Sequence, residues 1–247
     1  MSSHRVFVIG IDGATWGILE PLISGGHMPN LARLRAGGVW GELASTFIHA
    51  SAPAWATFMT GVNPGKHGVF YFQAPWREGH QRRILDSRDI QSPALWMLAS
   101  QAGRRVAVVN VPLTYPPHVV NGVMISGMLL APLAMSERMT YPDSLYQELR
   151  SAIGDFGLTI RSAEFKSLAP EEFLDQLTTT VKQRTRIVQY LMDRQAWDLF
   201  IAVFDSTDRL QHYLWQYMDP GHRFYDPARA AELRPRIEGF FHLLDDA

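Results

Sequence analysis

The sequence predicts an α/β fold with a central, mostly parallel sheet flanked by helices. Four short apolar runs rich in Val, Ile and Phe have the length of buried strands, at residues 6–11, 105–111, 123–126 and 199–204. These runs do not alternate cleanly between apolar and polar residues, as expected of interior strands covered on both faces. Helical patterns lie between them, and strands alternating with helices are typical of a parallel sheet.

Prolines and glycines mark the ends of the expected helices. A proline near the start and a glycine after the end predict helices over residues 29–36, 53–60 and 95–102. The longest helix is expected over residues 170–195, where apolar residues recur at three- and four-residue steps. Residues 70–92 have no strong period, so we expect them to leave the sheet.

Length and composition limit the classes of function. The chain has 247 residues, which we take as a single domain over 1–247. With 23 Lys and Arg against 24 Asp and Glu, it has no basic field for nucleic acid or an anionic membrane. The absence of Cys removes disulfides and thiolate chemistry, and leaves His, Asp and Glu as the strong metal ligands.

The expected location is the cytoplasm. The apolar run at residues 6–11 is too short for a secretory signal and is not followed by a small-residue cleavage site. No stretch approaches the roughly 18 apolar residues that a membrane span requires. The sequence does not indicate an oligomeric state.

The first candidate site residue is Asp12, which directly follows the strand at 6–11 and precedes Gly13. Ligands of open α/β sheets bind beyond the carboxyl ends of strands, so Asp12 stands where such sites form. A dinucleotide site is not indicated, because the glycine pattern that it needs is missing here. The alternative is that Asp12 caps the next helix.

The second candidate is Ser51, two residues before Pro53. Its hydroxyl is expected at the start of a helix, where free amides and the helix dipole favour an anion. The alternative is an ordinary N-cap serine. The hydroxyls of Thr57 and Thr60 are expected to face the core or to bond to their own helix, and His67 is expected to be a turn residue.

The third candidate is the pair Asp208 and His212, which follows the strand at 199–204. If a helix begins near Asp208, both side chains project from one face and can close on one ion. The alternative is an N-cap aspartate with an unrelated histidine. Together the three motifs suggest a metal-assisted serine nucleophile, because a divalent cation can deprotonate a hydroxyl and neutralise a phosphoryl oxygen.

The chain resembles the alkaline phosphatase superfamily, and within it the type I phosphodiesterase/nucleotide pyrophosphatase branch with its microbial phosphohydrolase- and phosphomutase-like members. The segments that carry the resemblance are VFVIGIDG at 6–13, residues 27–34, residues 51–68 ending in TGVNPGKHG, residues 110–117 and 121–127, and Asp208-x-x-x-His212. The resemblance implies an alkaline-phosphatase-like sandwich, and it covers only the front part of that catalytic domain.

The resemblance also implies a mechanism. Two divalent ions, zinc first and manganese second, would flank Ser51 as the catalytic nucleophile. Asp12 and the Ser51 oxygen would bind one ion, and Asp208 with His212 the other. The expected function is hydrolysis of a small-molecule phosphate ester through a phosphoseryl intermediate. The family's later Asp-His pair and distant His have no counterpart in this sequence.

Other functions stay open. A sulfatase would have Arg two residues after Pro53, where this chain has Trp55, so that reading is disfavoured. A cofactor-independent phosphomutase could use the same site. A non-catalytic or inactive fragment with an incomplete metal site is the alternative from another class. The residues that bind substrate are not assigned: Arg77, Arg82, Arg83, Tyr115 and His118 lie where family members vary, and surface solvation explains them equally well.

Overall fold

A computed structural model describes residues 4–74, 83–127, 136–157 and 168–247. Its strands are β1 (Val6–Ile11), β2 (Val106–Pro112), β3 (Gly122–Gly127), β4 (Thr140–Tyr141) and β5 (Leu199–Phe204). Its α-helices are α1 (Trp16–Ser24), α2 (Pro29–Gly37), α3 (Ser51–Thr60), α4 (Pro64–His67), α5 (Leu95–Gln101), α6 (Ser144–Ile153), α8 (Pro170–Arg194), α9 (Ser206–Met218) and α10 (Pro227–Asp246). Two short 3₁₀ helices are η1 (Ser87–Asp89) and η2 (Glu137–Met139).

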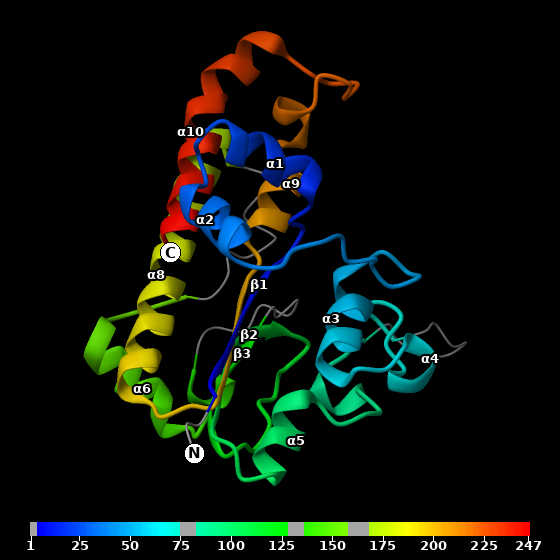
Figure 1. The fold of residues 1–247 in the computed structure, drawn as a ribbon, viewed down its shortest axis with the longest axis vertical. Coiled ribbons are helices and arrows are strands. Elements are labelled where there is room, and N and C mark those ends of the chain that lie inside the picture. Colours follow the sequence, from blue (N-terminus) through cyan, green and yellow to red (C-terminus); the bar gives the residue numbers. More distant parts are fainter. Residues whose placement is uncertain (1–3, 75–82, 128–135, 158–167) are drawn as a thin grey trace. The chain divides into compact units, whose positions relative to one another are not determined.

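The strands form one sheet in the order β1-β5-β2-β3-β4. β2 is parallel to both β5 and β3, whereas the short β4 is antiparallel to β3. The amides of Val6 and Asp12 donate to the carbonyls of Asp198 and Phe204, at equal spacing along both segments, so β1 is parallel to β5. The predicted α/β fold with a mostly parallel sheet is confirmed (Figure 1).

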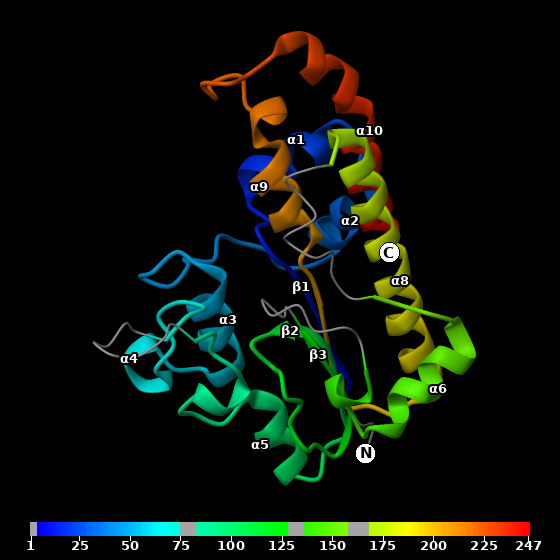
Figure 2. The same ribbon diagram turned by 180° about the vertical axis from the view of Figure 1, so that it is seen from behind.

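Helices cover both sides of the sheet. α3 and α5 pack against β2, and α6 packs against β4; Figures 1 and 2 show α3 and α5 on one side of the sheet and α6 on the other. The core between α3, α5 and the strands includes Met59, Trp96, Val108, Ile201 and Val203, all fully buried. None of the helices in the described part of the chain is long and apolar enough to cross a membrane.

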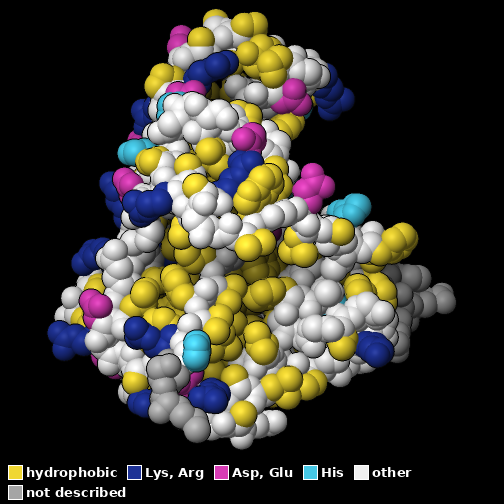
Figure 3. Space-filling model, viewed as in Figure 1, with side chains coloured by type: hydrophobic (Ala, Val, Ile, Leu, Met, Phe, Trp, Pro, Cys, Tyr) yellow, Lys and Arg dark blue, Asp and Glu magenta, His cyan; other side chains and the backbone are white. Residues whose placement is uncertain are grey.

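The expectation that residues 6–11 form an interior strand is wrong. β1 ends the sheet among the described residues, and Val6 and Ile9 are 53% and 52% exposed. Figure 3 shows hydrophobic side chains at the surface in the region of the sheet. Apolar composition alone cannot distinguish an edge strand from an interior one, because both need β-forming residues.

The described chain divides into two compact units. The first comprises residues 1–10, 44–158 and 186–203, and the second comprises residues 11–43, 159–185 and 204–247. β1, β5 and α8 each pass from one unit to the other. Within residues 70–92, which were expected to leave the sheet, Gln73 and Ile84 form an isolated antiparallel bridge. Residues 75–82, which include Arg77 and Arg82, lie outside the described residues.

In the second unit, the apolar stripe of α8 contains a buried arginine. Arg184 lies three residues after Val181 on this stripe and is completely buried. Its Nη1 donates to Oδ1 of Asp205 at 2.6 Å, and Arg209 Nε donates to Oδ2 at 2.9 Å. Burial raises the pKa of Asp205, but the two positive charges outweigh this effect and lower it to about 2. We call these three residues the Asp205 cluster.

The α2 helix receives its N-terminal cap from a distant residue. Pro29 stands at the first helical position, but the N-cap residue Met28 has no side-chain acceptor. The Asp245 carboxylate on α10 accepts hydrogen bonds from the amides of Asn30 and Leu31 at 2.6 and 2.8 Å. These bonds satisfy two of the free amides at the start of the helix, and the negative carboxylate interacts favourably with the positive end of the helix dipole.

Replacement of Asp205 tests how much the Asp205 cluster contributes to the free energy of unfolding. Asp205→Asn leaves the buried Arg184 charge without its carboxylate, so we expect the free energy of unfolding to fall by about 3–5 kcal/mol. Chemical denaturation measures the change. Asp175→Asn is the matched control, because its exposed ion pair with Arg236 contributes little. Equal losses in both variants would contradict this account.

The same cluster predicts a defined acid response. A carboxyl with a pKa of about 2 when folded and 3.8 when unfolded stabilises the fold fully above the unfolded value. That contribution disappears as the pH falls from about 4 through about 2. Denaturation midpoints measured across this window should therefore fall less steeply in Asp205→Asn than in the wild type.

Candidate active site

The ends of β1 and β5 are tied together in the second unit. The amide of Asp12 donates to the carbonyl of Phe204 at 2.9 Å, which continues the strand pairing to the last residue of β5. The Thr207 hydroxyl donates to the carbonyl of Asp12, and Gln211 Nε2 donates to the carbonyl of Gly13 at 2.8 Å. Three hydrogen bonds thus hold the turn after β1 against the start of α9.

Gly13 makes this close approach possible. Its φ is +74°, a conformation that favours glycine. A Cβ at this position would lie 2.9 Å from the Asp208 Cα and 3.2 Å from the Asp208 Cβ. The turn that carries Asp12 therefore packs directly on the residue that carries the second candidate carboxylate.

Asp208 and His212 face one another on α9. His212 Nε2 lies 3.4 Å from Asp208 Oδ1, and the side chain of His212 is 72% exposed against 26% for Asp208. Burial raises the pKa of Asp208 and the Asp205 charge adds to this, while His212 and Arg209 oppose it. A partly desolvated carboxylate beside an accessible imidazole is a donor set that suits a divalent cation such as zinc.

The capping alternatives do not apply to the candidate residues. The N-cap of α1 is Thr15, whose hydroxyl accepts from the Gly17 amide, so Asp12 does not cap that helix. The N-cap of α9 is Asp205, which places Asp208 within the first turn. Likewise the N-cap of α3 is Ala50, and Ser51 is the first residue of the helix.

The helix that carries Ser51 belongs to the first unit and begins two residues earlier than predicted. Ala52, Ala56 and Met59 bury one face of α3. The helix ends at Gly61, whose φ of +68° allows its amide to donate to the Thr57 carbonyl. The Thr60 hydroxyl donates to its own helix at the Ala56 carbonyl, as predicted.

The segment after α3 anchors the helix through a buried histidine. His67, expected to be a turn residue, is the last residue of α4 and is completely buried. The Val69 amide donates to its Nδ1 at 3.1 Å, which leaves the proton on Nε2 to donate to the Thr57 hydroxyl at 3.0 Å. Burial lowers the pKa of His67, which favours this neutral form. The TGVNPGKHG segment therefore acts as a structural brace for α3.

The structure brings three of the four candidate residues into one unit. Asp12, Asp208 and His212 belong to the second unit, whereas Ser51 belongs to the first. In the part of the chain that the structure describes, no group of three or more His, Asp or Glu side chains could hold a metal ion. Sequence reasoning missed Thr207 and Gln211, which share the first turns of α9 with Asp208.

The Asp205 cluster was also missed, although the sequence contained a signal for it. Arg184 falls on the apolar stripe of a helix, where an unpaired charge would be costly. The sequence therefore indicated that Arg184 has a buried acidic partner, without indicating which residue it is. Which carboxylate fills that role depends on how α8 packs in the second unit.

The sequence matches the family model described as type I phosphodiesterase/nucleotide pyrophosphatase over residues 6–237. Among curated proteins, no sequence matches the chain.

Solved structures with the same fold include two enzymes of different origin. One is phosphonoacetate hydrolase from Sinorhizobium meliloti 1021 in complex with phosphonoformate, which is 17% identical in sequence and has a TM-score of 0.55. The match covers 99% of the present chain and 52% of the hydrolase chain. The other is murine ectonucleotide pyrophosphatase/phosphodiesterase 5 in complex with AMP, which is 13% identical in sequence and has a TM-score of 0.53. This match covers 98% of the present chain and 53% of the murine chain. The chain thus spans about half the length of these proteins. This likeness confirms the predicted alkaline-phosphatase-like fold.

Removal of the Thr57 hydroxyl tests the brace. Thr57→Val keeps the shape of the side chain but leaves the buried Nε2–H of His67 without its acceptor, so we expect a loss of about 1–3 kcal/mol in unfolding free energy. Thermal and denaturant unfolding measure it. Thr60→Val is the control, since that hydroxyl bonds within its own helix; an equal loss in both would refute the special role of His67.

Proposed function

The chain belongs to the type I phosphodiesterase/nucleotide pyrophosphatase family, and we propose that it is a metal-dependent hydrolase of phosphoric esters. The observation that carries this proposal is the packing of the Asp12 turn on Asp208, with His212 on the same helix face. Two acidic side chains and an imidazole follow neighbouring strand ends, where ligands of such sheets bind, and the family generally depends on divalent metals.

The proposal follows the family resemblance and assigns two ligands to each of two ions. Asp12 and the Ser51 oxygen would hold one ion, and Asp208 with His212 the other. Carboxylate and imidazole ligands fit zinc best and tolerate manganese. When bound, such ions supply Lewis acidity that lowers the pKa of a hydroxyl and offsets charge on a phosphoryl group.

Ser51 is the nucleophile in this mechanism. Its hydroxyl stands in the first turn of α3, where helix amides and the dipole favour a negatively charged oxygen. The Ser51 oxygen attacks phosphorus, the bond from phosphorus to the leaving alcohol or phosphate breaks, and a phosphoserine ester is formed. The proton that Ser51 loses ends on the leaving group. Water then hydrolyses this ester, releases phosphate or its monoester, and returns the proton to Ser51.

The proposed substrate is a small phosphoric ester or anhydride. The two solved structures of this fold hold phosphonoformate and AMP, both small phosphorus oxyanions. A phosphodiester or a nucleotide with a pyrophosphate bond is therefore the first substrate class to assay. A phosphomutase would differ by returning the phosphoryl group to an acceptor alcohol.

A second candidate is a binding or inactive fragment. Its support is that each proposed ion has only two protein ligands, whereas zinc sites in enzymes and structural domains hold three or four. The assay that separates the two readings is hydrolysis with saturating Zn²⁺ or Mn²⁺. Absence of turnover at saturating metal would favour the fragment reading over the hydrolase.

Ser51→Ala tests the covalent mechanism. We expect turnover of a chromogenic phosphodiester to fall about a thousand-fold or more, because the attacking oxygen is gone. Acid-quenched wild-type protein should yield a phosphorylated Ser51 peptide by mass spectrometry. Ser144→Ala is the matched control, since Ser144 is also the first residue of a helix without a side-chain cap. An unchanged rate in Ser51→Ala would exclude the phosphoseryl intermediate.

Metal retention tests the ligand assignment. With two ligands for each ion, the 247-residue chain should lose zinc during dialysis in chelator-free buffer and show little hydrolysis without added metal. His212→Asn should weaken the remaining affinity by about ten-fold or more, whereas His222→Asn should leave it unchanged. Elemental analysis and zinc titration measure both. Two tightly held equivalents of zinc would show that further ligands exist.

A further inference from the structure

The first unit has a pocket that the proposed hydrolase chemistry does not use. Its volume is about 330 Å³, and it is open to solvent on one side. Met59, Ile90 and Met97 supply apolar walls, and Arg88, Ser92 and His118 supply polar groups. Ligand sites in proteins combine an apolar lining with a few polar groups in this way.

His118 lines this pocket, and two contacts fix the orientation of its ring and backbone. The buried Trp96 indole donates to His118 Nδ1 at 2.9 Å, and the His118 amide contacts the Met124 sulfur at 3.3 Å. Burial lowers the pKa of His118, so the ring is neutral near pH 7 and its proton is on Nε2. Among the residues that the structure describes, no side chain or carbonyl accepts a hydrogen bond from this N–H.

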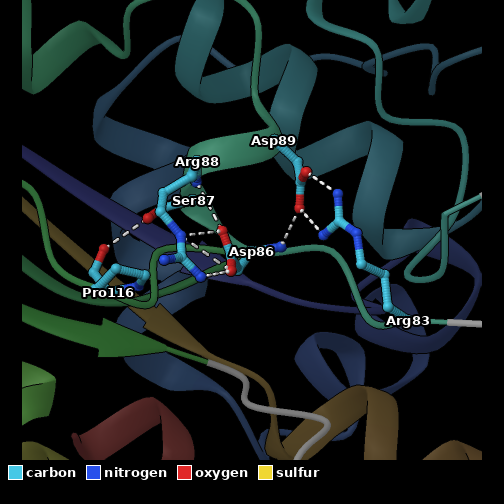
Figure 4. A network of polar contacts seen from close by, with 6 residues as sticks. All are labelled: Arg83, Asp86, Ser87, Arg88, Asp89 and Pro116. Atoms are coloured by element: carbon cyan, nitrogen blue, oxygen red, sulfur yellow. Dashed lines mark hydrogen bonds and ion pairs between the residues drawn. The ribbon is translucent and has the colours of Figure 1, made fainter.

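The rim of the pocket carries a network of ion pairs and hydrogen bonds, which Figure 4 shows. Arg88 folds back onto Asp86, to which both Nε and Nη2 donate, and Arg83 pairs with Asp89. The Ser87 hydroxyl donates to the carbonyl of Pro116 at 2.6 Å and ties η1 to the segment before β3. These contacts join η1 to its neighbours on both sides.

The charges on this rim limit the ligand. Hydrogen bonds from Arg88 lower the pKa of Asp86, so this pair is ionised and nearly neutral in sum. A doubly charged phosphate would therefore find little net positive charge here to balance its own charge. A single carboxylate can instead accept from the outer edge of Arg88, the His118 Nε2–H and the Ser92 hydroxyl, while an apolar body contacts the methionines.

The pocket lies away from the proposed nucleophile. Met59 is eight residues after Ser51 on α3, which is about 12 Å along the helix axis. A ligand against Met59 therefore occupies the opposite end of the helix from the Ser51 hydroxyl. Because one helix carries both, occupancy of the pocket can stiffen α3 without contact with the reacting atoms.

We propose that this pocket is an accessory binding site for a small organic monocarboxylate with an apolar body, recognised by His118 Nε2–H and Arg88. The proposal does not depend on the hydrolase assignment. Phenylacetate is the probe, with phenylacetamide as its neutral counterpart and inorganic phosphate as the competitor for a phosphoryl site. For about ten heavy atoms, a dissociation constant on the order of 1 mM is expected.

Binding is measured on the full chain by titration with phenylacetate, followed by imidazole ¹H–¹⁵N correlation spectra. The His118 Nε2 resonance should shift while its Nδ1 stays an acceptor, and phenylacetamide should bind more weakly. His118→Asn preserves an acceptor for Trp96 but removes the ligand donor, so the dissociation constant should rise about ten-fold. Melting temperatures of all variants verify folding.

Arg88→Gln is a second variant at an exposed position, and we expect it to weaken binding at least about three-fold. Its matched control is Arg83→Gln, from the same network but outside the pocket, which should bind normally. Ser51→Ala should also bind phenylacetate as the wild type does. Displacement of phenylacetate by phosphate, an unshifted His118 signal, or unchanged affinity in both His118→Asn and Arg88→Gln would overturn the proposal.

Discussion

The hydrogen bonds between the end of β1 and the end of β5 are the constraint on which the candidate site depends. They run from backbone to backbone at Asp12 and Phe204, and from the side chains of Thr207 and Gln211 back to the turn after β1. Each bond contributes only about 1 kcal/mol. Together they fix the position of the turn after β1, so that the buried residue Asp12 lies next to the first turn of α9, which carries Asp208.

A second carboxylate at the same helix start has a different role. Asp205 is enclosed by Arg184 and Arg209, and its pKa of about 2 keeps it ionised under physiological conditions. Asp208, three residues later, is partly desolvated and has a raised pKa. The arginines neutralise the first of these carboxylates, whereas the second lies 3.4 Å from the imidazole of His212.

In the first unit, α3 carries Ser51, a hydrogen bond to a buried histidine and one wall of a pocket. Its first residue is Ser51, its middle is held by the Thr57–His67 hydrogen bond, and Met59 near its end lines the cavity beside His118. Rigidity of this helix limits the positions that the Ser51 hydroxyl can sample.

The sequence by itself determined four strands and the helices α2, α3, α5 and α8, because local apolar periodicity and proline or glycine boundaries are short-range signals. It did not predict β4, α1 or α6. β1, β5 and the extent of α8 match the predicted ranges to within a residue, and the motif residues are enough to indicate the family. Only the tertiary structure decided that β1 is an edge strand, that Asp245 caps α2, and that Asp205 takes the buried Arg184. These choices join residues far apart in sequence, and many polar partners satisfy the same local pattern until packing selects one.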